Sequence, residues 1–245
     1  QHTISVNCQI SSIFRDIPIP NWNIKYTGLM RYKFFKDSFK RFSVAHTYKS
    51  SYTINQFRSN LDFYKSQTGL DSGGNFLNET IIQNINLVEQ FNPLLRIDFE
   101  TKSAFKILAE MKKDRALSLS FDNNLLTEVK GIEYVFGLGY RIKDVTFNSR
   151  MADNAQGIIK SDINIKVDVS YRNNKTIVRH LDYDDNQLAG GQNLWSIRFN
   201  ADYTFSKYLT ALFFYDHSFT KAVISTSFPL TTIRSGFTLR YSFGN

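Results

Sequence analysis

Long hydrophobic runs are missing from this sequence of 245 residues. The most apolar window, Tyr134–Tyr140, is seven residues long and includes Gly137 and Gly139. A membrane-spanning helix needs about 20 consecutive apolar residues, so a helical membrane protein is excluded. The mean hydropathy of −0.31 is still compatible with a membrane β-barrel, because only alternate side chains of a barrel strand meet lipid.

Cysteine is almost absent. Cys8 is the only one, which excludes an internal disulfide. Val6 and Asn7 before it lack the small side chains of a lipidation site. No signal peptide precedes the first strand-like segment, and the chain does not begin with Met. We therefore expect a mature product or the C-terminal piece of a longer chain.

Residue patterns that carry chemistry are also missing. The histidines lie far apart without metal-ligand spacing, at His2, His46, His180 and His217. Two of them, His46 and His217, fall on apolar-looking strand faces and are interpreted as packing residues. The acidic run 182–185 lacks EF-hand spacing and is interpreted as a solvated loop rather than a Ca²⁺ site. With no P-loop and no nucleophile elbow, we expect no catalytic residues, no metal, no cofactor and no enzymatic activity.

The charge is basic but dispersed. Lys and Arg number 30 against 22 Asp and Glu, a formal net charge of +8, and the two signs are interspersed. No dense basic block, RNP-like pattern or zinc finger is present, so nucleic acid is not an expected partner. Charge of this kind suits a wet lumen and loops near charged lipid headgroups.

Aromatic residues and alternating patterns are abundant. Phe, Tyr and Trp make up 15% of the chain and favour a pleated, half-buried surface. Between Ile159 and Arg172, odd positions are apolar or aromatic apart from Ser161, and even positions are polar. Because successive strand side chains point to opposite faces, this segment is predicted to be a strand with one apolar and one charged face.

The same period of two recurs along the chain. It is clear in Asn193–Phe205 and Ile233–Phe243. Further segments that show it are Thr3–Ile10, Trp22–Gly28, Phe42–Tyr48, Tyr52–Arg58, Leu95–Thr101, Phe105–Met111, Leu117–Phe121, Tyr134–Tyr140, Thr176–Leu181 and Leu209–His217. The predicted fold is all-β, a transmembrane antiparallel β-barrel segment of roughly 12 to 14 strands over residues 1–245, with no separate second domain.

Connections of two lengths are expected between these strands. Tight turns are predicted at 36–38, 101–103 and 206–207, and long polar loops at 11–21, 59–86, 141–157 and 182–192. Short turns on one side and long loops on the other are typical of outer-membrane barrels, although 11–21 and 141–157 fall on the short-turn side. The Gly137-Leu138-Gly139 sequence is expected inside a strand, where glycine marks a bend or a close approach.

Three features favour lipid over water around the apolar faces. The faces are nearly unbroken over segments longer than the roughly five to six residues of a soluble strand. Aromatic residues are expected at strand ends, where their rings would form interfacial girdles, at Trp22, Tyr48, Tyr140, Tyr171 and Tyr208. The chain also finishes on an alternating strand that is similar to the C-terminal signal of outer-membrane barrels, carried by Phe237, Leu239, Tyr241 and Phe243.

Five segments carry a resemblance to a known family. They are RDIPIPNW (15–22), LVEQFNPLLRIDFE (87–100), LSLSFDNNLLTEVKGIEYVFGLGYRIKDV (117–145), KSDINIKVDVSYRNNKTIVRHL (within 159–181) and SFPLTTIRSGFTLRYSF (227–243). In this order they resemble the C-terminal part of the SprA/Sov family, the outer-membrane translocons of type IX secretion and gliding motility in Bacteroidota. The resemblance covers essentially the whole chain, and Leu125 departs from the family pattern, which has Gln there.

The resemblance implies a wall segment rather than a whole barrel. Members of this family are very long chains whose strands close one giant barrel, so the remainder of the SprA-like chain would complete this segment. The protein would lie in the bacterial outer membrane, in contact with its lipid, and export folded cargo that carries C-terminal sorting domains. The other implied partners are a PorV-like shuttle barrel, a plug protein, a periplasmic isomerase-like subunit and the secreted cargo proteins.

The expected functional site is therefore a pair of faces. The residues expected to line the lumen are Lys160, Asp162, Asn164, Lys166, Asp168, Arg172, Arg198 and Asp202. The residues expected to face lipid are Ile163, Ile165, Val167, Val169, Ile197 and Phe199. Two alternatives remain open. One is a self-closed outer-membrane porin or transporter of roughly 12 to 14 strands, and the other is a soluble or surface β-binding module.

Overall fold

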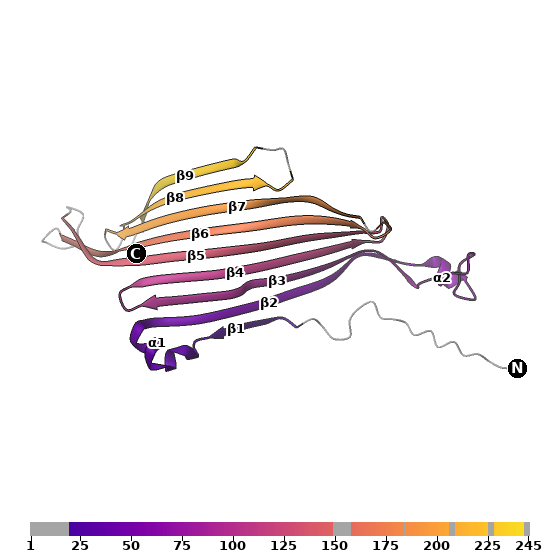
Figure 1. The fold of residues 1–245 in the computed structure, drawn as a ribbon, viewed down its shortest axis with the longest axis horizontal. Coiled ribbons are helices and arrows are strands. Elements are labelled where there is room, and N and C mark those ends of the chain that lie inside the picture. Colours follow the sequence, from indigo (N-terminus) through magenta and orange to yellow (C-terminus); the bar gives the residue numbers. More distant parts are fainter. Residues whose placement is uncertain (1–19, 149–157, 184, 206–208, 225–227, 243–245) are drawn as a thin grey trace.

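The structure, a computed structural model, describes residues 20–148, 158–183, 185–205, 209–224 and 228–242. These residues form one antiparallel sheet of nine strands in the order β1-β2-β3-β4-β5-β6-β7-β8-β9 (Figure 1). The strands are β1 Trp22–Tyr26, β2 Phe39–Ser59, β3 Thr80–Thr101, β4 Phe105–Ser120, β5 Leu125–Asn148, β6 Ile158–His180, β7 Asp185–Thr204, β8 Leu209–Ala222 and β9 Leu230–Tyr241. The all-β antiparallel prediction is confirmed.

Every strand pairs with its neighbour in sequence, so the sheet is a simple meander. Three short helices lie in the connections: η1 Gly28–Arg31, α1 Lys33–Ser38 and α2 Leu61–Lys65. Figure 1 shows them at the two ends of the strands, with α1 at one end and α2 at the other. None of the described helices is long and apolar enough to cross a membrane.

The sheet is a single layer without a conventional core. Among the described residues, the buried hydrophobic side chains are Tyr48, Tyr203 and Ala211, and no large side chain is fully buried. A sheet with an apolar face normally covers it with a second layer of helices or strands. Here no described element covers either face.

The sheet is open along both long edges. β1 pairs only with β2 and β9 only with β8, and these two edge strands are not paired with each other. The described chain is thus not closed into a barrel.

Fewer strands are found than expected, because several segments predicted as separate strands are joined. Phe42–Tyr48 and Tyr52–Arg58 are both part of β2, and Phe105–Met111 and Leu117–Phe121 fall in or next to β4. The same holds for 159–172 and 176–181, which β6 unites up to His180. Between the two segments of each pair, the alternation of apolar and polar side chains is interrupted, but the backbone hydrogen bonds to the neighbouring strand continue. A strand is defined by these hydrogen bonds and not by its side-chain pattern. The segment Thr3–Ile10 lies outside the described residues.

The predicted connections are also corrected. Residues 36–38 are not a turn but the end of α1, and most of the expected loop 182–192 belongs to β7, which starts at Asp185. Likewise β5 extends to Asn148 and β3 begins at Thr80, which shortens the two other described long loops. The tight turn after Thr101 is confirmed, whereas 11–19 and 206–207 lie outside the described residues. The strands extend well beyond their apolar parts, and for this reason polar residues that were expected in loops belong to the strands.

Candidate functional site: the two faces of the sheet

Strand register determines which side chains share a face. Val167 lies opposite Leu138 of β5 and Phe199 of β7, whereas its neighbour Lys166 lies opposite Gly139 and Asn200. Following these pairs across all nine strands gives an apolar face, which contains Val167, and a charged face, which contains Lys166. The predicted lipid-facing residues all fall on the first face and the predicted lumen-facing residues all fall on the second.

The apolar face carries an uncharged band that crosses all nine strands. Its members are Trp22, Ile24, Tyr26, Phe42, Val44, His46, Tyr48, Phe91, Leu95, Ile97, Phe99, Phe105, Ile107, Ala109, Met111, Ile132, Tyr134, Phe136, Leu138, Tyr140, Ile142, Ile163, Ile165, Val167, Val169, Tyr171, Trp195, Ile197, Phe199, Ala201, Tyr203, Ala211, Phe213, Tyr215, His217, Phe219, Thr231, Ile233, Ser235, Phe237, Leu239 and Tyr241. No Asp, Glu, Lys or Arg is among them. We call this set the apolar band.

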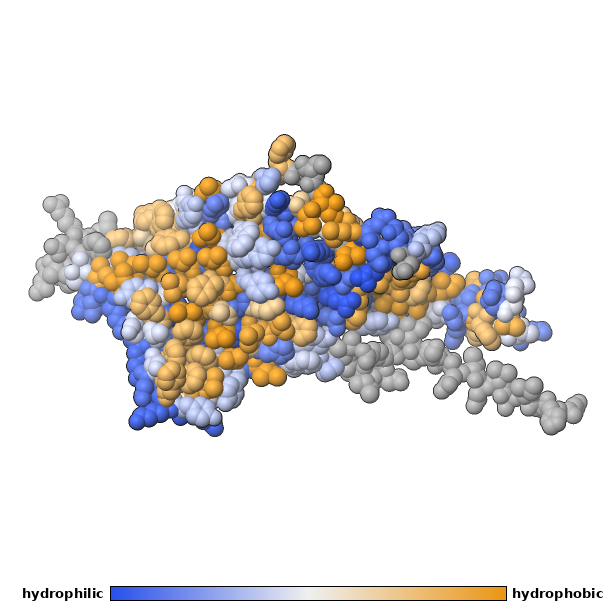
Figure 2. Space-filling view, in the orientation of Figure 1, coloured by the Kyte–Doolittle hydropathy of each residue, from blue (hydrophilic) through white to orange (hydrophobic). Residues whose placement is uncertain are grey.

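The length of the band differs between strands. On β6 it extends from Ile163 to Tyr171, which at about 3.3 Å per residue is roughly 26 Å along the strand, and on β4 from Phe105 to Met111, roughly 20 Å. Ile132 of β5 lies level with Lys113 of β4, at the border of the band nearer α2. At the roughly 40° tilt of membrane strands, these lengths correspond to about 15–20 Å along the membrane normal, compared with about 25 Å for the apolar zone of outer-membrane barrels. Figure 2 shows hydrophobic residues gathered over the middle of the strands and a hydrophilic region between them and the α2 end.

Aromatic pairs lie along both borders of the band. On the border nearer α2, the Tyr48 ring lies 4.5 Å from that of Trp22 and 4.8 Å from that of Phe91, and the Tyr171 ring lies 4.5 Å from Trp195. On the opposite border, the rings of Phe105 and Tyr140 are stacked at 4.3 Å, and those of Phe42 and Phe99 at 5.8 Å. The expectation that aromatic residues mark strand ends is wrong for Tyr48, Tyr140 and Tyr171. They mark the ends of the band, inside longer strands, and Tyr208 lies outside the described residues.

The band is open to its surroundings. Phe136, Trp195 and Phe237 keep 52%, 51% and 63% of their surface exposed. Contiguous apolar surface of this extent is rare on monomeric soluble proteins and marks an interaction with lipid or another chain. The C-terminal residues Phe237, Leu239 and Tyr241 share this face in β9, and Phe243 lies outside the described residues.

The charged face is connected by ion pairs that cross strands. Arg172 of β6 lies 3.0 Å from Asp114 of β4 and 3.2 Å from Glu133 of β5. At one end of the strands, Arg41 of β2 lies 2.8 Å from Asp98 of β3. Glu133 and Asp114 were not predicted as site residues. Glu133 directly precedes the alternating segment Tyr134–Tyr140, so extending that alternation by one residue could have found it. Asp114 lies between the two alternating segments of β4, and only the register brings it to Arg172.

The predicted lumen residues join this network. Asn164 donates to Asp202 at 2.8 Å, and Lys166 lies 2.8 Å from Asp168. Nearer the strand ends, Asp162 accepts the backbone N–H of Asp144, whose carboxylate is 3.1 Å from Lys160. Arg198 lies opposite Asp168 on one side and Asp216 on the other. The face therefore mixes both signs along its length without a single dominant charge.

Two glycines of β5 make room for the carboxylates of neighbouring strands. A Cβ at Gly137 would come within 2.7 Å of Asp168 Oδ1, and one at Gly131 within 2.8 Å of Asp114 Oδ2. Side chains from β4 and β6 therefore fold over the β5 backbone on the charged face. The expected place of Gly137 inside a strand is confirmed, and the groups that approach it are side chains of the neighbouring strands.

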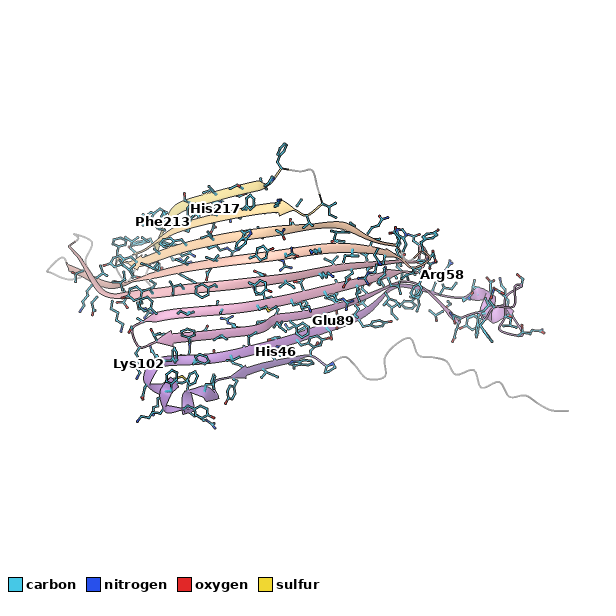
Figure 3. All side chains as sticks on the ribbon, in the orientation of Figure 1. His46, Arg58, Glu89, Lys102, Phe213 and His217 are labelled. Atoms are coloured by element: carbon cyan, nitrogen blue, oxygen red, sulfur yellow. The ribbon has the colours of Figure 1, made fainter. Side chains whose placement is uncertain are left out.

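A second charged cluster lies on the apolar face, beyond the border of the band nearer α2. Glu128 of β5 is 5% exposed and pairs with Arg115 of β4, at 2.9 Å, and with Arg179 of β6. Glu89 of β3 lies 4.0 Å from Arg115 and accepts the Tyr48 hydroxyl at 3.1 Å. Figure 3 shows His46, Glu89 and Arg58 in this order along β2 and β3 toward the α2 end. Sequence reasoning missed this cluster, because its members belong to four strands and are brought together only by register.

The histidines expected to pack on strand faces do so. His46 lies opposite Ile24, and its Nδ1 is 2.6 Å from the Leu94 carbonyl oxygen. His217 lies between Ile197 and Ile233 on neighbouring strands. No cluster of three His, Cys, Asp or Glu side chains that could hold a metal ion occurs among the described residues. His2, Cys8 and Asp184 lie outside them.

No known protein family and no curated protein matches this chain.

Proposed function

We propose that this sheet is a wall segment of a transmembrane β-barrel in a bacterial outer membrane. The observation that carries the proposal is the apolar band: an uncharged stripe across all nine strands, bordered by aromatic rows, on a sheet whose other face is ion-paired. Soluble sheets bury such a face under a second layer, and the described chain has none. Lipid supplies that layer.

Other strands complete the barrel in this proposal. Within the part of the chain that the structure describes, β1 has no strand neighbour besides β2 and β9 has none besides β8, and each unsatisfied backbone group costs several kcal/mol in hydrocarbon. The two edges are not paired with each other, so strands beyond the described sheet must pair with them. A barrel with many more strands than nine would enclose a wide aqueous lumen, which small barrels do not have.

The charged face lines that lumen. Its alternating cations and anions, such as Arg172 with Asp114 and Lys166 with Asp168, keep the wall wet. Because charges of both signs are already paired, the wall binds passing molecules weakly. This property suits passage of varied cargo.

Passage of folded proteins is the specific activity that we infer. This inference rests on the resemblance to the SprA/Sov translocons, and it brings with it cargo with C-terminal sorting domains, a PorV-like shuttle, a plug protein and a periplasmic isomerase-like subunit. The wall does no chemistry, and energy for export comes from elsewhere in the machinery.

Cysteine accessibility tests the membrane assignment. In a Cys8→Ser background, Val167→Cys and Lys166→Cys are treated in intact membranes with a membrane-impermeant thiol reagent. Val167 faces lipid in the proposal and Lys166 faces water, so the reagent labels the second and not the first. Equal labelling of both sites would sink the proposal.

A genetic experiment tests export separately. Deleting the gene should leave proteins with C-terminal sorting domains in the periplasm, measured by fractionation, while general outer-membrane integrity is retained. Normal export in the deletion strain would remove the translocon function and leave the membrane assignment standing.

A further inference from the structure

A hollow of about 590 Å³ opens on the apolar band between β3 and β7. Its lining includes Ala109, which lies opposite Ile97 of β3 and Phe136 of β5. Because alanine is much smaller than its neighbours, the band is recessed there. The wall nearer α2 is formed by Tyr134, Tyr171 and Trp195. The hollow is apolar, and its lining suits a hydrocarbon chain.

Basic side chains lie on the same face just beyond this aromatic wall. Lys113 follows Met111 of the hollow by two residues on β4, about 7 Å along the strand. One pleat further, Lys130 of β5 lies directly opposite Lys175 of β6 and opposite Arg115 of β4. Lys113 and Lys130 are exposed and Lys175 is half-buried.

These three lysines have no anionic partner among the described residues. The carboxylates nearest to them in the register are Glu89 and Glu128. Glu89 lies 4.0 Å from Arg115, and Glu128 pairs with Arg115 and Arg179. Like charges directly opposite each other on neighbouring strands are destabilising. An anion from outside the sheet would therefore stabilise this row of unpaired lysines at the border of the apolar band.

We propose that this place binds a phosphate-bearing lipid of the surrounding membrane. An acyl chain occupies the hollow over Ala109, the Tyr134, Tyr171 and Trp195 rings flank the glycerol or sugar region, and the phosphate lies among Lys113, Lys130 and Lys175. The inference rests on the proposed function, because the hollow must face lipid.

Continuity between the two features favours a lipid over a free anion or a protein. The cations and the hollow share one face of β4–β6 and meet at the aromatic border, so one amphipathic molecule fits both. Aromatic rings of this kind lie at the headgroup level of membranes. A free phosphate would use the lysines and leave the hollow unexplained.

Fluorescence of Trp195 tests the proposal, since this side chain lines the hollow. The protein is placed in nanodiscs of phosphatidylcholine with a small fraction of lipid brominated near the carboxyl end of its acyl chain. The headgroup of the brominated lipid is either phosphatidylcholine or phosphatidic acid. The Trp195 signal is the difference between the protein and its Trp195→Phe variant, and bromine quenches it on contact.

We expect brominated phosphatidic acid to give the same quenching as brominated phosphatidylcholine at a lipid fraction about fivefold lower. A roughly fivefold preference is what the attraction of about one lysine for the anionic headgroup supplies. The triple variant Lys113→Gln, Lys130→Gln, Lys175→Gln should lose this preference and still be quenched by both lipids. A control with the same charge change on the charged face, Lys49→Gln, Lys106→Gln, Lys112→Gln, should keep the preference.

Four other outcomes overturn the inference. Equal quenching by the two lipids, or loss of the preference in the control variant, removes the headgroup site and leaves the membrane wall intact. Loss of the preference on adding inorganic phosphate at constant ionic strength assigns the lysines to a free anion. Absence of quenching by either lipid removes the proposed function together with the inference.

Discussion

The apolar face of β4 and β5 has two stretches with opposite chemistry. Within the band it carries Ile107 and Met111 on β4 and Phe136 on β5, all exposed or half-exposed and all without a charge. Two to eight residues further along the same strands it carries Lys113, Arg115, Lys130 and the paired Glu128. The face, the strands and the period of two are the same in both stretches.

This difference shows where the surroundings of the sheet change. Strands of 16 and 24 residues are roughly 50 and 80 Å long, at about 3.3 Å per residue, and the apolar band occupies only part of that length. Charges beyond the band are tolerated because water reaches them there. The same charges inside the band would lie in hydrocarbon.

Moving a lysine along one strand should have the largest effect. Val167→Lys places a charge within the band and is expected to destabilise the inserted protein by roughly 2–4 kcal/mol if the site is near the midplane. Ile177→Lys changes an apolar residue of the same face and strand, beyond the border, and is expected to cost about 1 kcal/mol or less. Urea titration of the protein folded into lipid vesicles measures both.

A change on the charged face provides the second control for Val167→Lys. Lys166→Glu removes a pair with Asp168 in which the lysine is 60% exposed, and it is expected to change stability by about 1 kcal/mol or less. If Val167→Lys and Lys166→Glu had equal effects, the assignment of the two faces would fail.

The charged cluster beyond the border of the band should contribute less to the free energy of unfolding than the apolar band does. Glu128→Ala leaves Arg115 and Arg179 without their shared carboxylate, and both guanidinium groups are partly exposed, which limits the cost to about 1–2 kcal/mol. The loss should shrink in high salt, since screening reduces what the pairs contribute. A cost independent of salt would mean that the cluster is buried from water, contrary to its place outside the band.

Packing on the charged face supplies a smaller effect. Gly137→Ala brings a methyl group within 2.7 Å of Asp168 Oδ1 and 3.2 Å of Leu108 Cβ, and we expect a loss of about 1 kcal/mol. Gly139→Ala, on the same strand and face, meets Lys106 Cβ at 3.3 Å and should cost less. If the two variants had the same unfolding midpoint, Asp168 would not lie over the β5 backbone.

The connection that carries α2 should show the smallest effect, confined to acid pH. Asp71 accepts the Asn75 backbone N–H at 2.8 Å, and this bond, with those from the Asn75 side chain and Gly73, lowers the pKa of Asp71 below its ordinary value of 3.8. A lowered pKa means that the order of the loop tip is fully present above pH 3.8 and is lost as the pH falls through the lower folded-state value. The Gly73 amide resonance should therefore titrate with a midpoint under 3.8 and stay constant in Asp71→Asn.

The face of the sheet on which a side chain lies could largely be predicted from the sequence, and the lengths of the strands could not. Ile163, Val167 and Phe199 were assigned to one face from alternation alone, and the register places them there. Strand length failed at places such as Lys49 to Ser51 in β2, where the pattern weakens although hydrogen bonds to β3 continue. Backbone hydrogen bonds between strands do not depend on the polarity of the side chains. The alternating pattern therefore underestimates the length of a strand wherever the strand extends beyond the apolar band.

Alternation of side chains across a strand follows from covalent geometry, and for this reason the local order of residues was enough to separate Val167 from Lys166 and to indicate an all-β chain. The registers between strands are a property of the assembled sheet. They align nine short apolar stretches into one level band, bring Arg115 and Arg179 to Glu128 from two other strands, and set Lys130 opposite Lys175 beside the hollow over Ala109. These contacts join residues far apart in the chain, and a one-residue slip in any pairing would move a whole strand's side chains to the other face.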